Sequence, residues 1–411
     1  MKVGFIGIGK LGFPVAEVMA EKYDVVGYDI HPKEKTNFTI AKTLEEATKD
    51  RDLIFVAVET PHDSAYGGEA PSTHLPAKDF DYSPVQKVLR EVNQFVTKDQ
   101  LVVLISTVLP GTTRRNLVNE ISNARFIYNP YLIAMSSVKW DFVNPEMVII
   151  GTEDGSRTTD AKILVDFYET LMEKEDTRYE IGTWDEAEGI KIFYNTFISM
   201  KIGLVNMILD VSEKNKNMNV DVVTEAITRS TQRIMGPSYM RAGMGDGGPC
   251  HPRDNIALRW LAEELDLGYD IFGSLMHSRE KQAENMARKA LELGSHIVII
   301  GKAYKPRVSL TIGSYSLLVG HYIEKLGGQV TYYDPNTGDT TLPEEATPVY
   351  LIGYWDQWVK EFDFATGSTV LDPWRMMASK EGVNVVHYGN TRLNESVNSG
   401  ATASASISSS I

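Results

Sequence analysis

A single cysteine, Cys250, is the residue of this sequence best suited to nucleophilic chemistry. It lies in a twelve-residue segment, 243–254, that contains four glycines and two prolines. Because glycine opens positive φ and proline lacks a backbone donor, the segment is predicted to be a rigid loop rather than a helix or strand. A lone cysteine is often only a small buried hydrophobic residue. Glycines that leave the backbone open to a ligand favour the functional interpretation.

A lysine and an asparagine form a second candidate pair on a long helix predicted from Trp184 to about residue 213. Lys191 and Asn195 are four residues apart and therefore share one helix face. Their neighbours are apolar: Ile190, Ile192, Phe193, Phe197 and Ile198. The alternative is a lysine whose stem lies on apolar surface beside a solvated asparagine. A helix this long commonly joins two domains, so its polar face is expected to line a cleft.

The amino-terminal residues read as strand, glycine turn, helix and strand, with a carboxylate, Asp29, at the end of the second strand. In a dinucleotide fingerprint the glycines allow a tight turn, close approach of a pyrophosphate and helix–sheet packing. A carboxylate in that place accepts from a ribose hydroxyl, which favours NAD over NADP. Lys33 could soften that preference or be solvated. The predicted turn comprises Gly7, Ile8, Gly9, Lys10, Leu11 and Gly12.

Two later strands, 53–58 and 101–105, end in polar loops. Ligands of parallel sheets bind at the carboxyl ends of strands, which places Thr60, Ser106 and Thr107 on the cofactor side. Thr107 could bind a ligand or only satisfy backbone. The insert 62–81 is predicted to be an irregular loop, either a lid, an oligomer contact or a surface excursion.

A second α/β unit begins with a strand at 296–301 and continues with a helix at about 314–326. Further strands are predicted to end at Tyr333 and to span 349–352 and 369–372. Because this half lacks a full glycine fingerprint, its ligand should differ from that of the first. Lys305 follows a strand, where it could meet a ligand phosphate or hydroxyl, or be a surface lysine.

Composition restricts the possible partners. The chain has 411 residues, 43% of them hydrophobic, and a formal charge of −14, which argues against nucleic acid or an anionic membrane as partner. One cysteine excludes an internal disulfide, and no unbroken apolar run reaches roughly 18 residues. We expect a cytoplasmic α/β protein. Two Rossmann-like doubly wound parallel-sheet domains, 1–183 for NAD and 291–393 for a second ligand, are joined by a helical central domain, 184–290. The tail, 394–411, is expected to be disordered.

The order of these motifs resembles the UDP-glucose/GDP-mannose dehydrogenase family over nearly the whole chain. The resemblance rests on the glycine turn with Asp29, Ser106 to Thr113, Asn129-Pro130, Lys191 with Asn195, the segment 243–254, and, further on, Gly301 to Pro306, Tyr333-Asp334-Pro335 and Asp372 with Arg375. It implies an NAD-dependent nucleotide-sugar 6-dehydrogenase that oxidises a sugar C6 alcohol to a carboxylate in two steps, UDP-glucose being the leading substrate. It also implies a homodimer formed through the long helix, and no metal.

The resemblance further implies residue roles. Cys250 would attack the aldehyde, Lys191 and Asn195 would hold the oxyanion, and Asp254 and Thr107 would orient a water. The nucleotide-sugar would be held by Lys305, Arg241, the backbone at Gly245, a stacking Tyr239, and Arg375, which would reach the sugar or a neighbouring subunit. Four residues depart from the family pattern. Tyr131 replaces a glutamate that supports thioester hydrolysis. Ile312 replaces an arginine, for which Arg307 or Arg253 could substitute near the cofactor. Asp246 and Pro249 replace an aromatic and a small polar residue.

Two other functions fit the residues less fully. A two-electron dehydrogenase of 3-hydroxyacids would use Lys191 and Asn195 and leave Cys250 structural, but would not need the third domain. A protein that only binds NAD or a nucleotide-sugar is suggested by Tyr131 and Ile312. The retained Cys250 argues against it.

Overall fold

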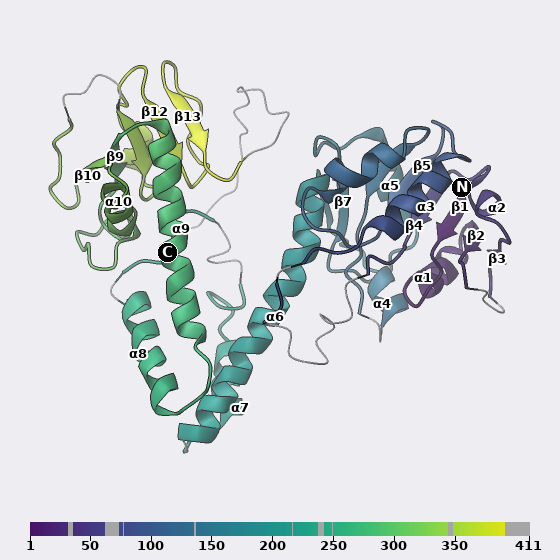
Figure 1. Ribbon diagram of the computed structural model, residues 1–411, viewed down its shortest axis with the longest axis horizontal. Coiled ribbons are helices and arrows are strands. Elements are labelled where there is room, and N and C mark those ends of the chain that lie inside the picture. The colour runs from purple at the N-terminus through teal and green to yellow at the C-terminus, as the bar shows by residue number, and fades with distance from the viewer. Residues whose placement is uncertain are drawn as a thin grey trace. The chain divides into compact units, whose positions relative to one another are not determined.

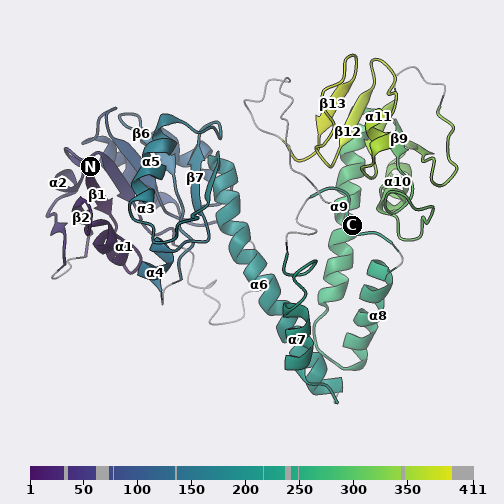
Figure 2. The ribbon, with the colours of Figure 1, turned by 180° about the vertical axis from the view of Figure 1, so that it is seen from behind.

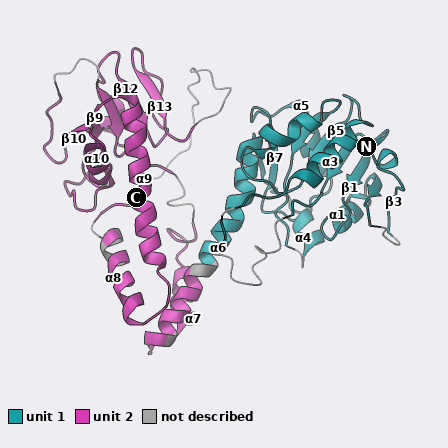
Figure 3. Cartoon of the chain, viewed as in Figure 1, with its two compact units in different colours: residues 1–202 teal, residues 203–411 magenta. Residues whose placement is uncertain are grey.

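The computed structural model describes residues 1–31, 36–61, 74–76, 78–134, 137–215, 217–236, 242–248, 250–343 and 348–390. Lys33, Tyr239, Arg241, most of the insert 62–81 and the tail from 394 lie outside these residues. The chain divides into two compact units, 1–202 and 203–411, which Figure 3 shows in teal and magenta. Each unit is built around its own parallel or mostly parallel sheet.

The first unit contains, within the described residues, a sheet of eight strands in the order β3-β2-β1-β4-β5-β6-β7-β8 (Figure 1). Its central order is that of a doubly wound dinucleotide-binding sheet, and only the β6–β7 pair is antiparallel. The strands are β1 (Lys2–Ile6), β2 (Asp24–Tyr28), β3 (Thr39–Ile40), β4 (Leu53–Val56), β5 (Leu101–Leu104), β6 (Arg125–Tyr128), β7 (Val148–Thr152) and β8 (Tyr179–Thr183).

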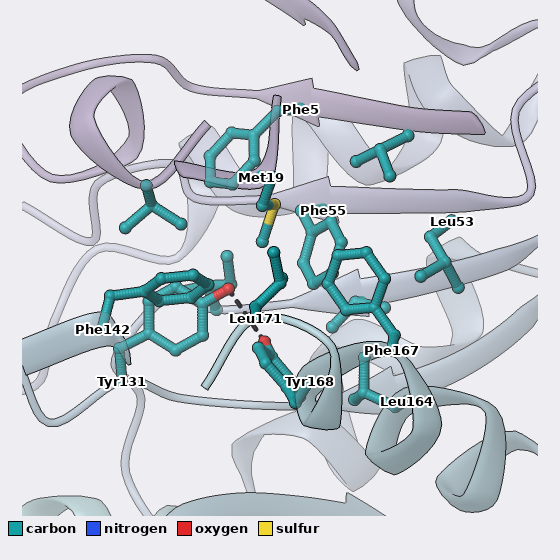
Figure 4. Close-up of a cluster of buried hydrophobic side chains, with 14 of the residues drawn as sticks. Phe5, Met19, Leu53, Phe55, Tyr131, Phe142, Leu164, Phe167, Tyr168 and Leu171 are labelled. Atoms are coloured by element: carbon teal, nitrogen blue, oxygen red, sulfur yellow. Dashed lines mark hydrogen bonds between the residues drawn. The ribbon is translucent and has the colours of Figure 1, made fainter. Parts of the chain in front are cut away.

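Helices cover both faces of this sheet, which explains why its central strands are continuous apolar runs. Every residue of β4 and β5 is buried, and successive side chains enter opposite cores. One core, part of which Figure 4 shows, packs against α1 (Gly12–Met19), α4 (Val138–Val143) and α5 (Thr159–Glu169). The other packs against α2 (Leu44–Thr48), α3 (Ser83–Asn93) and the short turns Thr113–Leu117 and Val118–Glu120.

The long helix α6 (Trp184–Asn215) begins with a reciprocal cap. Glu186 accepts from the Thr183 backbone N–H at 2.8 Å, and Thr183 Oγ1 accepts from the Glu186 N–H at 3.2 Å. The helix crosses the boundary between the two units at residue 202, so the predicted three-domain division stays a prediction. Among the described helices, α6 is the one long and apolar enough to cross a membrane, a criterion that a helix packed against protein also meets.

The second unit contains, within the described residues, a parallel sheet in the order β10-β9-β11-β12-β13 (Figure 2). This order is the flavodoxin-like form of the doubly wound fold. The strands are β9 (His296–Ile300), β10 (Gln329–Tyr333), β11 (Val349–Ile352), β12 (Thr369–Asp372) and β13 (Asn384–His387). The helices are α7 (Val220–Thr228), α8 (Cys250–Glu264), α9 (Ile271–Leu293), α10 (Tyr315–Lys325) and α11 (Gln357–Glu361).

The predicted fold class is therefore confirmed, and the elements named from the sequence agree with the structure to within about two residues. One local prediction is wrong. Cys250 does not lie in a loop but begins α8. The four glycines all precede the helix, and Pro252 lies in its first turn, where a missing backbone donor leaves no hydrogen bond unmade.

Candidate active site

The glycine turn between β1 and α1 is built for close approach of a phosphate group. Gly7 has a φ of +91°, and a Cβ at Gly12 would lie 2.1 Å from the Gly7 carbonyl oxygen, so both positions require glycine. A Cβ at Gly9, by contrast, would have no heavy atom of the described residues within 4 Å. The turn thus leaves open space where the fingerprint needs its backbone uncovered, at the amino end of α1.

Asp29 lies directly after β2, at the same edge of the sheet. Its Oδ1 accepts a hydrogen bond from the His31 backbone N–H at 2.8 Å, which fixes the carboxylate. A carboxylate at the end of the second strand is placed to accept from an adenosine ribose. The turn and the acid together fit NAD.

Side-chain hydroxyls connect the neighbouring loops at this edge. Thr60 Oγ1 donates to the Thr107 carbonyl oxygen at 2.8 Å, and Ser106 Oγ donates to the Val58 carbonyl oxygen at 2.5 Å. Both hydroxyls therefore satisfy backbone of the adjacent strand end. The three predicted residues Thr60, Ser106 and Thr107 are brought together, in positions set by β4 and β5.

Glu188, which was not predicted, ties α6 to the loop after β5. Its carboxylate is fully buried and accepts from the backbone N–H groups of Gly111 at 2.5 Å and Thr113 at 2.6 Å. Burial raises its pKa, against the effect of these hydrogen bonds. Its only sequence signal is its place one helical turn before Lys191. Glu188 sets the position of the loop relative to the helix.

Lys191 lies on the same helix, with its ammonium partly buried. Its Nζ donates to the Tyr131 carbonyl oxygen at 2.7 Å, and burial lowers its pKa. Asn195 follows one turn later on the same face and is exposed. The two residues lie on one helix face, as their spacing predicts, and the ammonium is less hydrated than at an open surface. Their service to a common ligand stays a prediction.

The Tyr131 side chain points into the core and not toward Lys191. Figure 4 shows its hydroxyl beside that of Tyr168, at 3.0 Å, and the Tyr168 hydroxyl donates to Asn129 Oδ1 at 2.5 Å. The Phe142 ring packs edge-on against the Tyr131 ring, with 5.6 Å between the ring centroids. Burial raises the pKa of the Tyr131 hydroxyl, so this residue is no substitute for a catalytic carboxylate.

In the second unit, the glycines before Cys250 pack against aromatic rings. A Cβ placed on three of them would lie 3.0 Å or less from a ring atom: Gly243 at 2.4 Å from Trp374, Gly245 at 2.2 Å from Tyr315, and Gly248 at 3.0 Å from Tyr304. The expectation that these glycines only leave space for a ligand is therefore incomplete, because packing within the unit requires them as well.

The structure also places the other predicted residues of this unit, except Tyr239 and Arg241, which lie outside the described residues. The Lys305 ammonium lies 5.4 Å from the centroid of the Tyr304 ring. Arg375 donates to the backbone oxygens of Ala242 at 2.5 Å and Tyr388 at 3.1 Å. Arg307 pairs with Asp356 at 3.4 Å, and Ile312 is 63% exposed. Of Cys250, Arg253 and Asp254 the structure gives the place in α8.

The fold and the glycine turn define a protein that binds a dinucleotide. Residues 32–172 match the model of the UDP-glucose/GDP-mannose dehydrogenase family, NAD binding domain, and residues 185–280 match the family's central domain. These matches cover more than half of the chain, which therefore belongs to the UDP-glucose/GDP-mannose dehydrogenase family. NAD is its cofactor. Among the described residues no group of three or more His, Cys, Asp or Glu could hold a metal ion.

Two relatives and one solved structure are similar to this chain. The UDP-glucose 6-dehydrogenases of Rickettsia prowazekii and Rhizobium meliloti are each 28% identical over 73% of this chain. The match spans about two thirds of these relatives, 66% and 67% of their length. The ternary complex of GDP-mannose dehydrogenase from Pseudomonas aeruginosa has a TM-score of 0.80 at 20% identity, over 94% of this chain and 99% of that one. It shares the fold.

Proposed function

We propose that the protein oxidises the C6 hydroxyl of a nucleotide-sugar to a carboxylate, in two steps through Cys250, with conversion of UDP-glucose to UDP-glucuronate as the leading reaction. One observation carries this proposal. The only cysteine of the chain is the first residue of α8, inside the region that matches the family's central domain. Unpaired backbone N–H groups at a helix start lower the pKa of a thiol and so favour the thiolate.

The thiolate of Cys250 would form two covalent intermediates. NAD, when bound, accepts one hydride in each of the two oxidations. The thiolate adds to the aldehyde carbon of the first product to give a thiohemiacetal, and loss of the second hydride leaves a thioester. Water then releases the carboxylate and regenerates the thiol. In this scheme Asp254 and Thr107 orient the water, because the buried Tyr131 cannot.

Lys191 and Asn195 would stabilise the negative charge that develops on the sugar oxygen. The partly buried ammonium of Lys191 supports this role, since a poorly hydrated cation interacts more strongly with an oxyanion than a fully solvated one does. One such donor is typically worth about 10²–10³ in rate. For the cofactor we propose contacts from the glycine turn, Asp29, Thr60, Ser106, Thr107, Lys33 and Arg253.

For the nucleotide-sugar we propose contacts from Lys305, Tyr239, Arg241, the Gly245 backbone and Arg375. The support is local: Gly245 belongs to the segment that precedes Cys250, and Arg375 donates to the Ala242 carbonyl oxygen of the same segment. Because the chain carries a net charge of −14, an anionic pyrophosphate needs a few cationic side chains close together at its binding site. Neither nucleic acid nor a membrane is proposed as a partner.

We further propose a cytoplasmic homodimer. Large apolar side chains of α6 are exposed in the single chain, among them Phe193 at 67% and Met200 at 63%. Contiguous exposed apolar residues on a soluble fold commonly mark a protein interface. A second copy of the chain is the simplest cover, and light scattering after size-exclusion chromatography tests it: a monomeric mass would contradict the dimer.

The function is tested by counting NADH formed per nucleotide-sugar consumed across a panel of UDP- and GDP-sugars. Two NADH per sugar supports the proposal, and one NADH indicates a two-electron dehydrogenase. No NADH across the panel would indicate a protein that only binds NAD or a nucleotide-sugar. Cys250→Ala should abolish acid formation while NAD binding persists. Unchanged acid production by this variant would remove the cysteine from the mechanism.

A further inference from the structure

The segment Ala242–Gly248, which leads to Cys250, is fixed at three points by residues from elsewhere in the second unit. At its start, Arg375 Nη2 donates to the Ala242 carbonyl oxygen at 2.5 Å. At its end, the Gly248 N–H donates to the Gly313 carbonyl oxygen at 3.2 Å, with Gly248 at a φ of +87°. Between these points, the carboxylate of Asp246 pairs with Arg279 of α9.

Arg279 is held on several sides. Its Nε donates to Asp246 Oδ1, and its Nη2 approaches the Asp246 carbonyl oxygen at 3.4 Å. Its guanidinium lies 5.3 Å from the centroid of the Tyr315 ring, whose hydroxyl donates to the Arg279 carbonyl oxygen at 3.0 Å. The arginine side chain is only 11% exposed. A guanidinium suits this place because it can stack on a ring and donate to a carboxylate at once.

The same tyrosine ring also contacts the segment. A Cβ at Gly245 would lie 2.2 Å from a Tyr315 ring atom, so the Gly245 backbone rests against that ring. Gly245, Asp246, Arg279 and Tyr315 therefore form a closed set of contacts between the segment, α9 and α10. We refer to the ion pair and the ring as the Asp246 clamp. The clamp restricts the backbone four and five residues before α8 begins.

We propose that Asp246 and Arg279 are positioning residues for Cys250, which they affect through the backbone of the segment that precedes it. This inference rests on the proposed function, in which the Cys250 thiol reacts. Gly248 is separated from Cys250 by one residue, so a segment fixed in place also fixes the first turn of α8. Unpaired N–H groups of that turn favour the thiolate only while the helix start is formed.

A purely structural ion pair would give a different result. Its loss would lower the stability of the second unit and leave the reactivity of a thiol on another element unchanged. A positioning pair changes the reactivity of Cys250 in protein that is still folded. Because the chain has one cysteine, alkylation of the native protein reports on this thiol alone, whether or not the enzyme turns over.

The test compares Arg279→Met and Arg279→Lys with a matched control, Arg288→Met. Arg288 lies on the same helix, pairs with Glu284 at 2.5 Å, and has a side chain that is 57% exposed. Alkylation by iodoacetamide at pH 7 is followed by intact mass. We expect Arg279→Met to slow alkylation by about fivefold or more, since an unfixed helix start no longer activates the thiol. Arg279→Lys should be intermediate, and Arg288→Met should match the wild type within about twofold.

Hydrogen exchange of the peptide around residues 242–250 should increase in Arg279→Met but not in the control. If Arg279→Met does not fold, as judged by thermal unfolding, Asp246→Asn serves in its place because it removes the charge with little change of shape. An alkylation rate within about twofold of the wild type, or a faster one, in a folded variant would overturn the inference. If no nucleotide-sugar is oxidised by the wild type, the proposed function fails while the alkylation comparison still decides the clamp.

Discussion

The turns after the first strand of the two sheets, β1 and β9, have similar backbones but different partners for their amide groups. Both turns begin with a glycine of positive φ, Gly7 at +91° and Gly301 at +103°. Both are followed in the sheet by a second strand that ends beside an aspartate, Asp29 after β2 and Asp334 after β10. In each case the carboxylate Oδ1 accepts from the N–H two residues on, that of His31 at 2.8 Å and of Asn336 at 2.9 Å.

The difference lies in the other carboxylate oxygen. Asp334 is fully buried, and its Oδ2 accepts from the backbone N–H groups of Lys302 at 2.9 Å and Ala303 at 2.8 Å. These are amides of the turn after β9, so the protein itself supplies the anion there. In the first sheet the space at Gly9 is open, and the cofactor's ribose is the partner expected for Asp29. In the second sheet the protein's own carboxylate thus accepts from amides that would face a phosphate in a dinucleotide-binding turn.

Asp334→Ala should have the largest effect on this comparison. It would leave two buried amides and the Tyr354 hydroxyl, which donates to Asp334 Oδ1 at 2.8 Å, without their acceptor. We expect the free energy of unfolding of the second unit to fall by about 4 kcal/mol, with NAD affinity unchanged. Urea denaturation measures this. Asp339→Ala, which removes a partly exposed pair with Lys302, is the control and should cost about 1 kcal/mol or less. A similar small loss for both variants would contradict the buried role of Asp334.

Tyr131→Glu tests whether position 131, in the loop after β6, faces the substrate or the core. A glutamate at this position would place an unpaired carboxylate among Tyr168 and Phe142, so we expect a loss of about 3 kcal/mol in unfolding free energy and no faster product release. Tyr131→Phe loses only a hydroxyl pair and should cost about 1 kcal/mol. Faster product release by a stable Tyr131→Glu protein would show that position 131 faces the substrate after all.

Gly9→Ala separates binding from stability in the first turn. The added Cβ meets no atom of the described residues within 4 Å, so the thermal midpoint should stay unchanged. The same Cβ would occupy the approach of the pyrophosphate, and we expect the dissociation constant for NAD to rise by about tenfold or more in calorimetry. Gly12→Ala, whose Cβ would lie 2.1 Å from the Gly7 oxygen, should lose stability as well. Unchanged affinity in Gly9→Ala would place the pyrophosphate elsewhere.

Glu188→Gln should have the smallest effect, visible as a pH dependence. Burial raises the pKa of Glu188 above its ordinary value of 4.5, so the folded protein binds this proton more tightly than the unfolded chain does. The stability from that proton is present below pH 4.5 and is lost as the pH rises through the folded pKa. As the pH rises from 4.5 through the folded pKa, the unfolding free energy of the wild type minus that of the variant should therefore fall. Glu91→Gln, at a side chain that is 46% exposed, serves as the control. A difference that is flat with pH would show that Glu188 titrates normally.

The sequence by itself determined the fold class, the place of most strands, the NAD turn and the shared face of Lys191 and Asn195. These features depend on local patterns: apolar runs buried on two faces, glycines at fixed spacing and the period of a helix. It also singled out Cys250, since a lone cysteine among glycines is visible in the sequence alone.

Only the tertiary structure decided which polar groups meet. Glu188 reaches amides 75 and 77 residues earlier in the chain, and Tyr131 turns its hydroxyl toward Tyr168, 37 residues later. The sequence interpretation took the glycines before Cys250 as space for a ligand. The aromatic rings that require them belong to the loops after β9 and β12 and to α10, all much later in the chain. Contacts between distant segments depend on how the elements pack, and no local pattern records them.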